Sequence, residues 1–192
     1  MNNLIVFDFD GTLFKCDSTK FAYKCLYNKK LFFFFSYYLL NTHWYIFYLL
    51  FNDFSPLAKS RCVYLRKKFN ILKLSDSFKF KSSLYHIRIL NELEKASLSN
   101  YKIIVVSAGI KEIIYSLLPK HIDTILIANS FNDLCLPFIN YEQKVVSLNL
   151  FFKDNFSIHA AYGNTRGDIP LLKLSKKAYW VNADGSFNEI NF

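Results

Sequence analysis

Short apolar runs that end in polar residues recur along the chain and predict the strands of a parallel sheet. The first run, residues 4–10, is rich in β-branched and aromatic side chains and ends in carboxylates followed by a glycine. Similar runs occupy residues 101–106, 124–128, 158–162 and 178–182. The segments between them favour helices, roughly at residues 83–97, 110–118, 142–153 and 168–176. Because strands and helices alternate, we expect an α/β fold with a Rossmann-like, doubly wound parallel sheet.

Residues 14–82 interrupt this alternation, since they are rich in Phe, Tyr, Leu and Lys and show no clear strand pattern. We therefore predict a helical cap at residues 14–82, inserted after the first strand, and an α/β catalytic core formed by residues 1–13 and 83–192. The cap contains two strongly apolar stretches, residues 31–40 and 44–51. Each stretch is shorter than the ~20 residues that a membrane-spanning helix needs.

Polar residues follow several of the predicted strands, at the edge where doubly wound sheets bind ligands. Asp8 and Asp10 lie two positions apart, which would place both carboxylates on one face of an extended strand. Two carboxylates this close repel each other unless a cation lies between them or one is protonated. Ser107–Gly109, Gly163–Asn164 and Ala183–Gly185 follow three later strands. We expect these groups to converge on one site.

The motifs resemble, in chain order, those of the haloacid dehalogenase-like phosphatase superfamily. The first is Phe7-Asp8-Phe9-Asp10-Gly11-Thr12-Leu13, the second is Val105–Gly109, the third is Lys144 and the fourth is Gly163–Asp168. The position of the cap and the Tyr162-Gly163-Asn164 sequence most resemble the phosphoserine phosphatase-like branch, which includes phosphatidylglycerophosphatase C-like enzymes. The resemblance implies a phosphatase that depends on Mg²⁺.

The resemblance also implies a role for each motif residue. Asp8 would attack phosphorus and form an aspartyl-phosphate, and Asp10 would protonate the leaving oxygen and later activate water. Lys144 would offset the developing negative charge. Lys153 is the alternative third-motif lysine, and we prefer Lys144 because it opens a predicted helix. The substrate phosphate would be bound by Gly11, Thr12, Ser107, Ala108, Gly109 and Lys144.

Mg²⁺ binds oxygen ligands, and the resemblance implies Asp8, Asp10 through its carbonyl, Asn164 and Asp168. Asn164 departs from the family, which usually has Asp at this position. A neutral amide oxygen replaces a carboxylate there, so we expect a weaker hold on the metal. The departure leaves open a second interpretation, a catalytically inactive relative that binds a membrane or a protein partner.

Several polar residues outside the motifs have structural interpretations. We expect Asp17 to cap the first cap helix rather than to contact substrate. Arg166 is expected to be a solvated loop arginine, and Asp184 is either a supporting group of the site or part of a turn. The four histidines have no metal-ligand spacing and are interpreted as structural: His43, His86, His121 and His159.

The positive charge of the chain is concentrated in one segment. Residues 13–90 contain 14 Lys and Arg against 3 Asp, a net charge of +11, whereas the rest of the chain carries −2. This favours an anionic partner. The cap either buries its aromatics in a small helical bundle or forms an interfacial hairpin on anionic lipid. No recognition motif supports binding to nucleic acid.

The interfacial interpretation makes a lipid phosphate the favoured substrate. A soluble phosphomonoester, such as phosphoserine or a sugar phosphate, is the alternative. Recognition of phosphoserine would need an acid for the ammonium group, and the cap contains only three acids. The chain begins without a basic segment or a long apolar core, and its cysteines form no CxxC pair. We therefore expect a cytoplasmic protein in peripheral contact with the inner face of the membrane.

Overall fold

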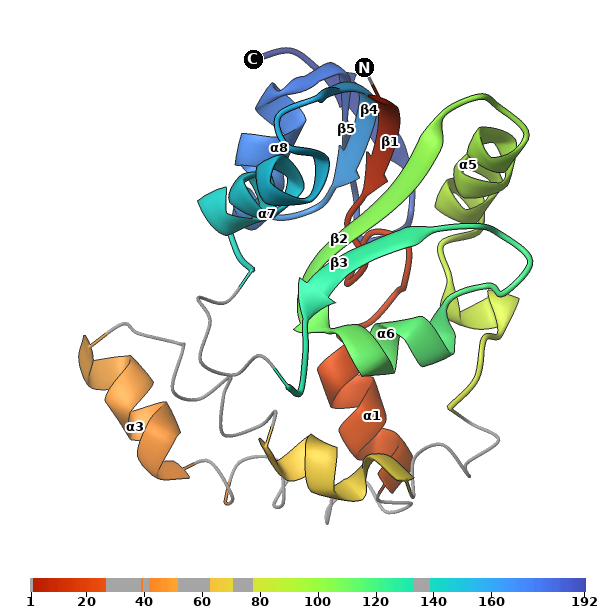
Figure 1. The fold of residues 1–192 in the computed structure, drawn as a ribbon. Coiled ribbons are helices and arrows are strands. Elements are labelled where there is room, and N and C mark those ends of the chain that lie inside the picture. The colour runs from red at the N-terminus through yellow and green to blue at the C-terminus, as the bar shows by residue number, and fades with distance from the viewer. Residues whose placement is uncertain (1, 27–38, 40–41, 52–62, 71–77, 133–138) are drawn as a thin grey trace.

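The computed structural model describes residues 2–26, 39, 42–51, 63–70, 78–132 and 139–192. Within this part of the chain, six strands form one sheet in the order β3-β2-β1-β4-β5-β6 (Figure 1). Neighbouring strands are parallel except β5 and β6, which are antiparallel. The predicted α/β fold with a Rossmann-like parallel sheet is confirmed, and the antiparallel β6 is an addition to it. The strands are β1 (Asn2–Phe7), β2 (Lys102–Ile110), β3 (Ile125–Asn129), β4 (Phe156–Gly163), β5 (Ser175–Val181) and β6 (Phe187–Ile190).

Helices follow the strands as the sequence pattern predicted, with small differences in their limits. The helices of the core are α5 (Ile87–Ser97), α6 (Lys111–Leu117), α7 (Glu142–Phe152) and α8 (Ile169–Lys173). Two single-turn 3₁₀ helices, η1 (Ser82–Leu84) and η2 (Arg166–Asp168), precede α5 and α8. The alternation of strands and helices therefore correctly placed the elements on which the motifs lie.

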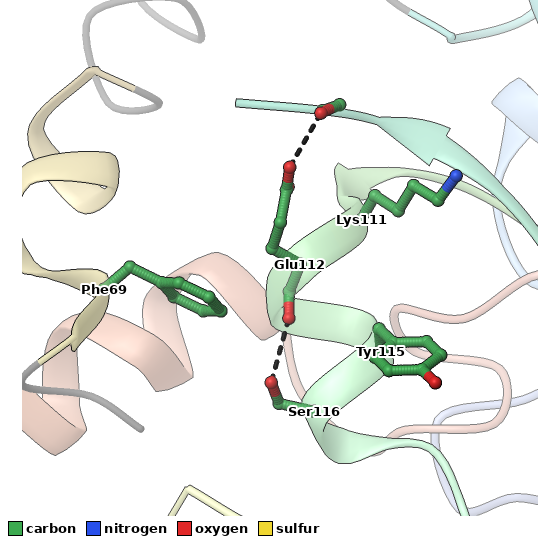
Figure 2. Close-up of a pocket in the computed structure, with 6 residues that line it drawn as sticks. Phe69, Lys111, Glu112, Tyr115 and Ser116 are labelled. Atoms are coloured by element: carbon green, nitrogen blue, oxygen red, sulfur yellow. Dashed lines mark hydrogen bonds between the residues drawn. The ribbon is translucent and has the colours of Figure 1, made fainter. Parts of the chain in front are cut away.

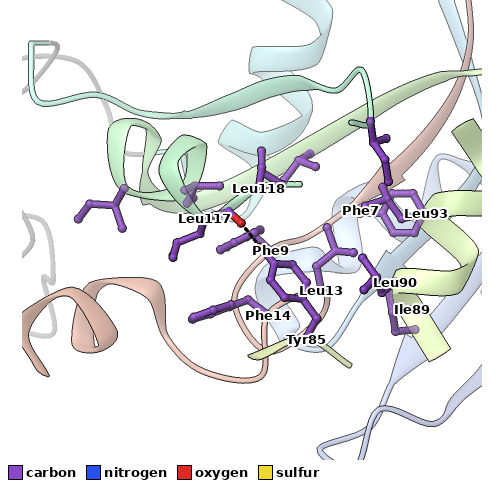
Figure 3. Close-up of a cluster of buried hydrophobic side chains, with 14 of the residues drawn as sticks. Phe7, Phe9, Leu13, Phe14, Tyr85, Ile89, Leu90, Leu93, Leu117 and Leu118 are labelled. Atoms are coloured by element: carbon purple, nitrogen blue, oxygen red, sulfur yellow. Dashed lines mark hydrogen bonds between the residues drawn. The ribbon is translucent and has the colours of Figure 1, made fainter. Parts of the chain in front are cut away.

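Two apolar clusters, one on each face of the sheet, hold the core together. Leu4 and Val6 of β1 belong to the cluster that contains Leu148 of α7 and Leu171 of α8. Phe7 belongs to the other cluster, which α5 and α6 cover (Figure 3). Neighbouring side chains of a strand point to opposite faces, so a continuously apolar run such as β1 can be buried on both sides.

The described part of the predicted cap is helical. It contains α1 (Ser18–Leu26), α3 (Thr42–Phe51) and a helix at residues 63–70. All three lie beyond the edge of the sheet to which the arrows of β1, β2 and β3 point (Figure 1). The apolar stretch 44–51 falls in α3, whereas the stretch 31–40, apart from Leu39, lies outside the described residues. Among the helices that the structure describes, none has the length and apolar character needed to cross a membrane.

The first strand is shorter than predicted, because it ends at Phe7 instead of continuing to Asp10. A tight turn follows, in which the N–H of Gly11 donates to the carbonyl of Phe14 at 2.7 Å and Gly11 has a φ of +80°. Glycine adopts this conformation without the steric cost that a side chain would meet. Asp8 and Asp10 are therefore not two positions on one strand face, and the expectation that they share that face is wrong.

The antiparallel strand β6 was not predicted, since its four residues carry too little pattern to identify. It is joined to β5 by a tight turn, in which Asp184 Oδ1 accepts hydrogen bonds from the main-chain N–H and the hydroxyl of Ser186 at 2.9 and 2.6 Å. These bonds form a local Asx turn. Of the two interpretations of Asp184, the structure supports the turn.

Candidate active site

Three predicted motifs meet at the carboxyl edge of the sheet because their strands are neighbours. β1 lies between β2 and β4, and Phe7 is in register with Val105 on one side and Tyr162 on the other. The chain continues past this point with the Asp8 N–H donating to the carbonyl of Tyr162 at 2.9 Å. Motifs that are far apart in the sequence therefore lie close together at the edge where doubly wound sheets bind ligands.

Lys144 lies in the first turn of α7 and is the cation at the centre of this edge. The residue is only 3% exposed, and its Nζ donates to Asp8 Oδ1 at 2.7 Å and to Asp168 Oδ1 at 2.5 Å. Lys153, the alternative third-motif lysine, is the exposed C-cap residue of the same helix. The structure therefore brings Lys144, and not Lys153, to Asp8.

The burial of Asp8 and Lys144 changes their proton affinities. Burial raises the pKa of Asp8 to about 6, with Lys144 lowering it and Asp168 raising it. Burial alone would lower the pKa of Lys144, but Asp8 and Asp168 outweigh that effect and raise it above the ordinary value. At pH 7 and above, the group is therefore a lysinium ion held between two carboxylates.

Thr12 places the amide of the fourth motif beside Asp8. Its buried hydroxyl lies 3.0 Å from Asp8 Oδ2 and 3.1 Å from Asn164 Oδ1. One hydroxyl hydrogen can satisfy only one of these two oxygens at a time. Gly11 allows this approach, because a Cβ at position 11 would lie 2.2 Å from Asn164 Nδ2. A carboxylate oxygen and an amide oxygen that share one donor form a donor set that suits a hard cation such as Mg²⁺.

Asp168 supports the loop that carries Asn164. Its Oδ2 accepts hydrogen bonds from the main-chain N–H groups of Asn164 and Thr165 at 3.1 and 2.9 Å and from the Thr165 hydroxyl at 2.8 Å. Thr165 and Asp168 form a capping box at the start of η2. With Lys144 on Oδ1, both oxygens of Asp168 already have protein partners. The role of Asp168 as a metal ligand stays a prediction, and its observed role is to position the loop.

The described residues contain no group of three His, Cys, Asp or Glu side chains arranged to hold a metal ion. Asp8 and Asn164, each with an oxygen beside the Thr12 hydroxyl, would supply the side-chain ligands at this edge. Mg²⁺ usually keeps several waters and needs only one or two protein carboxylates. Such a sparse set of oxygens fits Mg²⁺ and would not fit Zn²⁺, which is usually bound by Cys and His.

Asp10 has different partners from Asp8. Its Oδ1 accepts a hydrogen bond from the main-chain N–H of Ser18 at 2.7 Å, and its Oδ2 accepts one from the Ser18 hydroxyl at 3.1 Å. Burial, together with the nearby carboxylates of Asp17 and Asp8, raises the pKa of Asp10 well above its ordinary value. Asp10 is therefore a buried carboxyl group that retains its proton more readily than an exposed one.

Ser18 is a partner of Asp10 that the sequence did not reveal. The predicted N-cap of α1 is confirmed, since Asp17 Oδ1 accepts a hydrogen bond from the main-chain N–H of Lys20 at 2.8 Å. Ser18 is the first residue of that helix and is fully buried. A serine beside an N-cap residue is common, so the eight-residue separation from Asp10 did not indicate that Ser18 would contact Asp10. Only the turn at Gly11 brings residue 18 back to residue 10.

The second motif packs against the same pair. A Cβ at Gly109 would lie 3.0 Å from both Asp10 Oδ2 and Ser18 Oγ. Ser107 is buried, and its hydroxyl oxygen accepts a hydrogen bond from the Gly109 N–H at 3.0 Å. Ala108 is exposed, and its carbonyl accepts a hydrogen bond from Asn129 Nδ2 at 2.6 Å. The phosphate-binding role of this loop stays a prediction.

A pocket of about 410 Å³ lies between α6 and the helix at residues 63–70 (Figure 2). Phe69 and Tyr115 contribute aromatic surface to it, and Lys111, the first residue of α6, lies two residues after Gly109 of the second motif. Glu112 accepts a hydrogen bond from the Ser130 hydroxyl at 2.7 Å, which fixes the segment after β3. The pocket is therefore a mainly apolar space between the helix at residues 63–70 and α6.

A family model of haloacid dehalogenase-like hydrolases matches residues 5–173. No curated protein matches the chain. The matched span includes Asp8, Asp10, Lys144, Asn164 and Asp168, and it ends in α8. The assignment to the phosphoserine phosphatase-like branch stays a prediction. Because the match covers most of the chain and all four motifs, the protein belongs to the haloacid dehalogenase-like hydrolase family.

Proposed function

We propose that this hydrolase cleaves phosphomonoesters with Mg²⁺ through an aspartyl-phosphate on Asp8, and that its substrates are lipid phosphates. The proposed reaction chemistry rests on one observation, that Asp8 and Asp10 lie in different environments. Asp8 is paired with Lys144 at 2.7 Å, whereas Asp10 has Ser18 as its partner and a strongly raised pKa. Groups whose environments separate their proton affinities are suited to different roles in acid–base catalysis.

In the proposed reaction a carboxylate oxygen of Asp8 attacks phosphorus, and the bond from phosphorus to the alcohol oxygen breaks. Asp10 gives its proton to that oxygen as the alcohol leaves. The Asp10 carboxylate then takes a proton from water, whose oxygen attacks the aspartyl-phosphate and releases inorganic phosphate. Lys144 holds Asp8 in place and offsets negative charge. Mg²⁺, held by Asp8 and Asn164, would neutralise charge on the phosphate oxygens.

The cap supports the lipid part of the proposal. Its described residues contain Asp17 as their single carboxylate, and that group caps α1, so an ammonium-bearing substrate such as phosphoserine finds little to pair with there. The pocket beside the second motif offers mainly apolar walls. A substrate with an anionic head and an apolar remainder matches both features.

A substrate panel tests the proposal. Phosphate release should require Mg²⁺, and the ratio kcat/KM should be higher for phosphatidate and phosphatidylglycerophosphate than for phosphoserine or sugar phosphates. A preference for phosphoserine would overturn the lipid assignment while leaving the chemistry standing. Absence of phosphate release from every substrate, including an aryl phosphate, with any divalent cation would overturn the chemistry.

Replacing Ser18 by Ala is expected to slow hydrolysis of alkyl phosphates by about 10-fold or more, because Asp10 loses one of its two hydrogen bonds and is held less firmly. The main-chain N–H at position 18 remains, which limits the loss. Hydrolysis of p-nitrophenyl phosphate should fall much less, since nitrophenolate leaves without a proton. Values of kcat/KM for both substrates give the comparison, because they report the steps up to formation of the aspartyl-phosphate and not the later attack of water. Ser82→Ala, at an exposed serine, is the matched control, and equal losses for the two substrates would contradict this role of Ser18.

Replacing Asn164 by Asp is expected to lower the Mg²⁺ concentration for half-maximal activity, because a second carboxylate beside Asp8 attracts the cation more strongly. A larger rise of Tm on adding Mg²⁺ provides a measurement that does not depend on turnover. Asn188→Asp, at an exposed position of β6, adds the same charge away from the site and should change neither value. A higher Mg²⁺ requirement in Asn164→Asp would show that Asn164 is not a ligand.

A further inference from the structure

Three aliphatic side chains form an exposed stripe on α3. Ile46 is 51% exposed, Leu49 is 64% exposed and Leu50 is 72% exposed. The spacing of three and four residues places them on one face of the helix. Leu39, earlier in the chain, is 66% exposed as well. Single exposed leucines are ordinary, but neighbouring ones on one helix indicate a surface that is covered by a partner.

The helix at residues 63–70 presents exposed cations. Leu65 is fully buried, and Tyr64 stacks on Tyr23 of α1 with ring centroids 5.5 Å apart. Phe69 packs edge-on against Phe131 of the core with centroids 5.3 Å apart. These contacts fix the inner face of the helix. Its exposed residues include three consecutive cations, Arg66, Lys67 and Lys68.

Charge decides which partner fits. The described residues between 14 and 82 include eight exposed cations but one carboxylate, Asp17. The cations are Lys15, Lys20, Lys24, Arg66, Lys67, Lys68, Lys79 and Lys81. A second copy of the chain would bring the same positive surface and would be repelled. An anionic bilayer offers negative headgroups for the cations and an acyl boundary for the stripe.

We propose that the cap docks on anionic membranes, with Ile46, Leu49 and Leu50 inserted at the acyl boundary and Arg66, Lys67 and Lys68 on the headgroups. The cap helices lie on the same side of the sheet as the carboxyl edge that carries Asp8 (Figure 1). Docking therefore brings the active-site edge toward the lipid surface. The idea that docking delivers substrate to the active site rests on the proposed function. The docking itself does not require catalysis.

Vesicle co-sedimentation tests the docking. The protein should bind vesicles of phosphatidylcholine with phosphatidylglycerol at low salt, and bind phosphatidylcholine alone much more weakly. The triple variant Arg66→Gln, Lys67→Gln, Lys68→Gln should weaken binding by about 100-fold, given the usual contribution of each basic residue at an anionic surface. The triple variant Ile46→Gln, Leu49→Gln, Leu50→Gln should weaken it by at least about 10-fold.

Exposed residues of the core provide matched controls. Leu98, Leu150 and Leu174 are 90%, 76% and 52% exposed, so changing all three to Gln alters a similar aliphatic area away from the cap. Changing the exposed Lys102, Lys176 and Lys177 to Gln is the control for charge. Neither control should alter vesicle binding by more than the general effect of net charge. Binding of either cap variant at wild-type strength would overturn the proposal.

Two further measurements separate the alternatives. Light scattering on the purified protein would reveal a dimer that the aliphatic variant converts to a monomer, and that result would assign the stripe to a second copy instead. Hydrolysis of p-nitrophenyl phosphate without vesicles should be unchanged in both cap variants, and Asp8→Asn should bind vesicles like the wild type. Activity without binding overturns the docking alone, whereas binding without activity overturns the proposed function alone.

Discussion

Asp8→Asn is expected to lower phosphate release by at least about 10⁴-fold, because the amide cannot attack phosphorus as a carboxylate does. The fold should survive. Asn retains an oxygen for Thr12, and Lys144 keeps Asp168 as its partner. Steady-state phosphate release in saturating Mg²⁺ measures the loss, and urea unfolding in EDTA measures the stability.

The pH dependence of that stability gives a further check on the same variant. The folded-state pKa of Asp8, about 6, is higher than its ordinary value of 3.8, so ionised Asp8 opposes folding. Protonated Asp8 favours the folded state. This contribution to stability is fully present below about pH 4 and is lost as the pH rises through about 6. In EDTA at pH 8, Asp8→Asn should therefore be at least as stable as the wild type. Asp123→Asn, at an exposed position, is the control and should change neither activity nor stability. Residual activity above a few per cent in Asp8→Asn would contradict the assignment of Asp8 as the nucleophile.

Lys144→Met is expected to reduce activity by about 10²-fold or more and to destabilise the protein by about 3–5 kcal/mol at pH 8. Met has a similar length but no charge, so the two buried carboxylates of Asp8 and Asp168 would face each other without a cation. Lys144 lowers the pKa of Asp8, so its removal raises that pKa further. The loss should therefore be largest at pH 8 and smaller at pH 5, where Asp8 takes up a proton on folding.

Urea unfolding of this variant at both pH values in EDTA measures the effect. Lys153→Met is the matched control, since it removes an exposed lysine from the other end of α7 and should leave stability and activity near wild-type values. Adding Asp168→Asn to Lys144→Met should recover part of the stability but none of the activity. Equal destabilisation at pH 5 and pH 8 would show that lost packing, and not charge, causes the effect.

The sequence predicted the parts of the fold that rest on strong periodic patterns. β1, β2 and β4 are buried on both faces, so their apolar runs were visible, and their neighbouring positions followed from the parallel alternation. β6 has only four residues and pairs antiparallel with β5 at the end of the sheet. No pattern in the sequence predicted this strand or its direction. The end of β1 was missed because an apolar residue, Phe9, lies between the two carboxylates and made the turn look like a strand.

The candidate site was predictable as a set of residues but not as a set of contacts. Lys144 could be chosen from the chain because it opens a helix, and the structure brings it to Asp8. Asp168 was assigned to the metal by its residue type, yet Lys144 and Thr165 already occupy its two oxygens. Which carboxylate faces which donor depends on turns and helix starts, where a single residue changes the direction of the chain.

The separation of the active-site partners along the chain has a consequence for biosynthesis. Asp8 and Lys144 are 136 positions apart, and Asp168 lies 24 positions further on. In a growing chain on the ribosome, Asp8 is therefore made long before Lys144, the cation that contacts it. Contacts this distant cannot form until the sheet is nearly complete. We therefore expect chains that end before Lys144 to lack this ion pair and to be inactive.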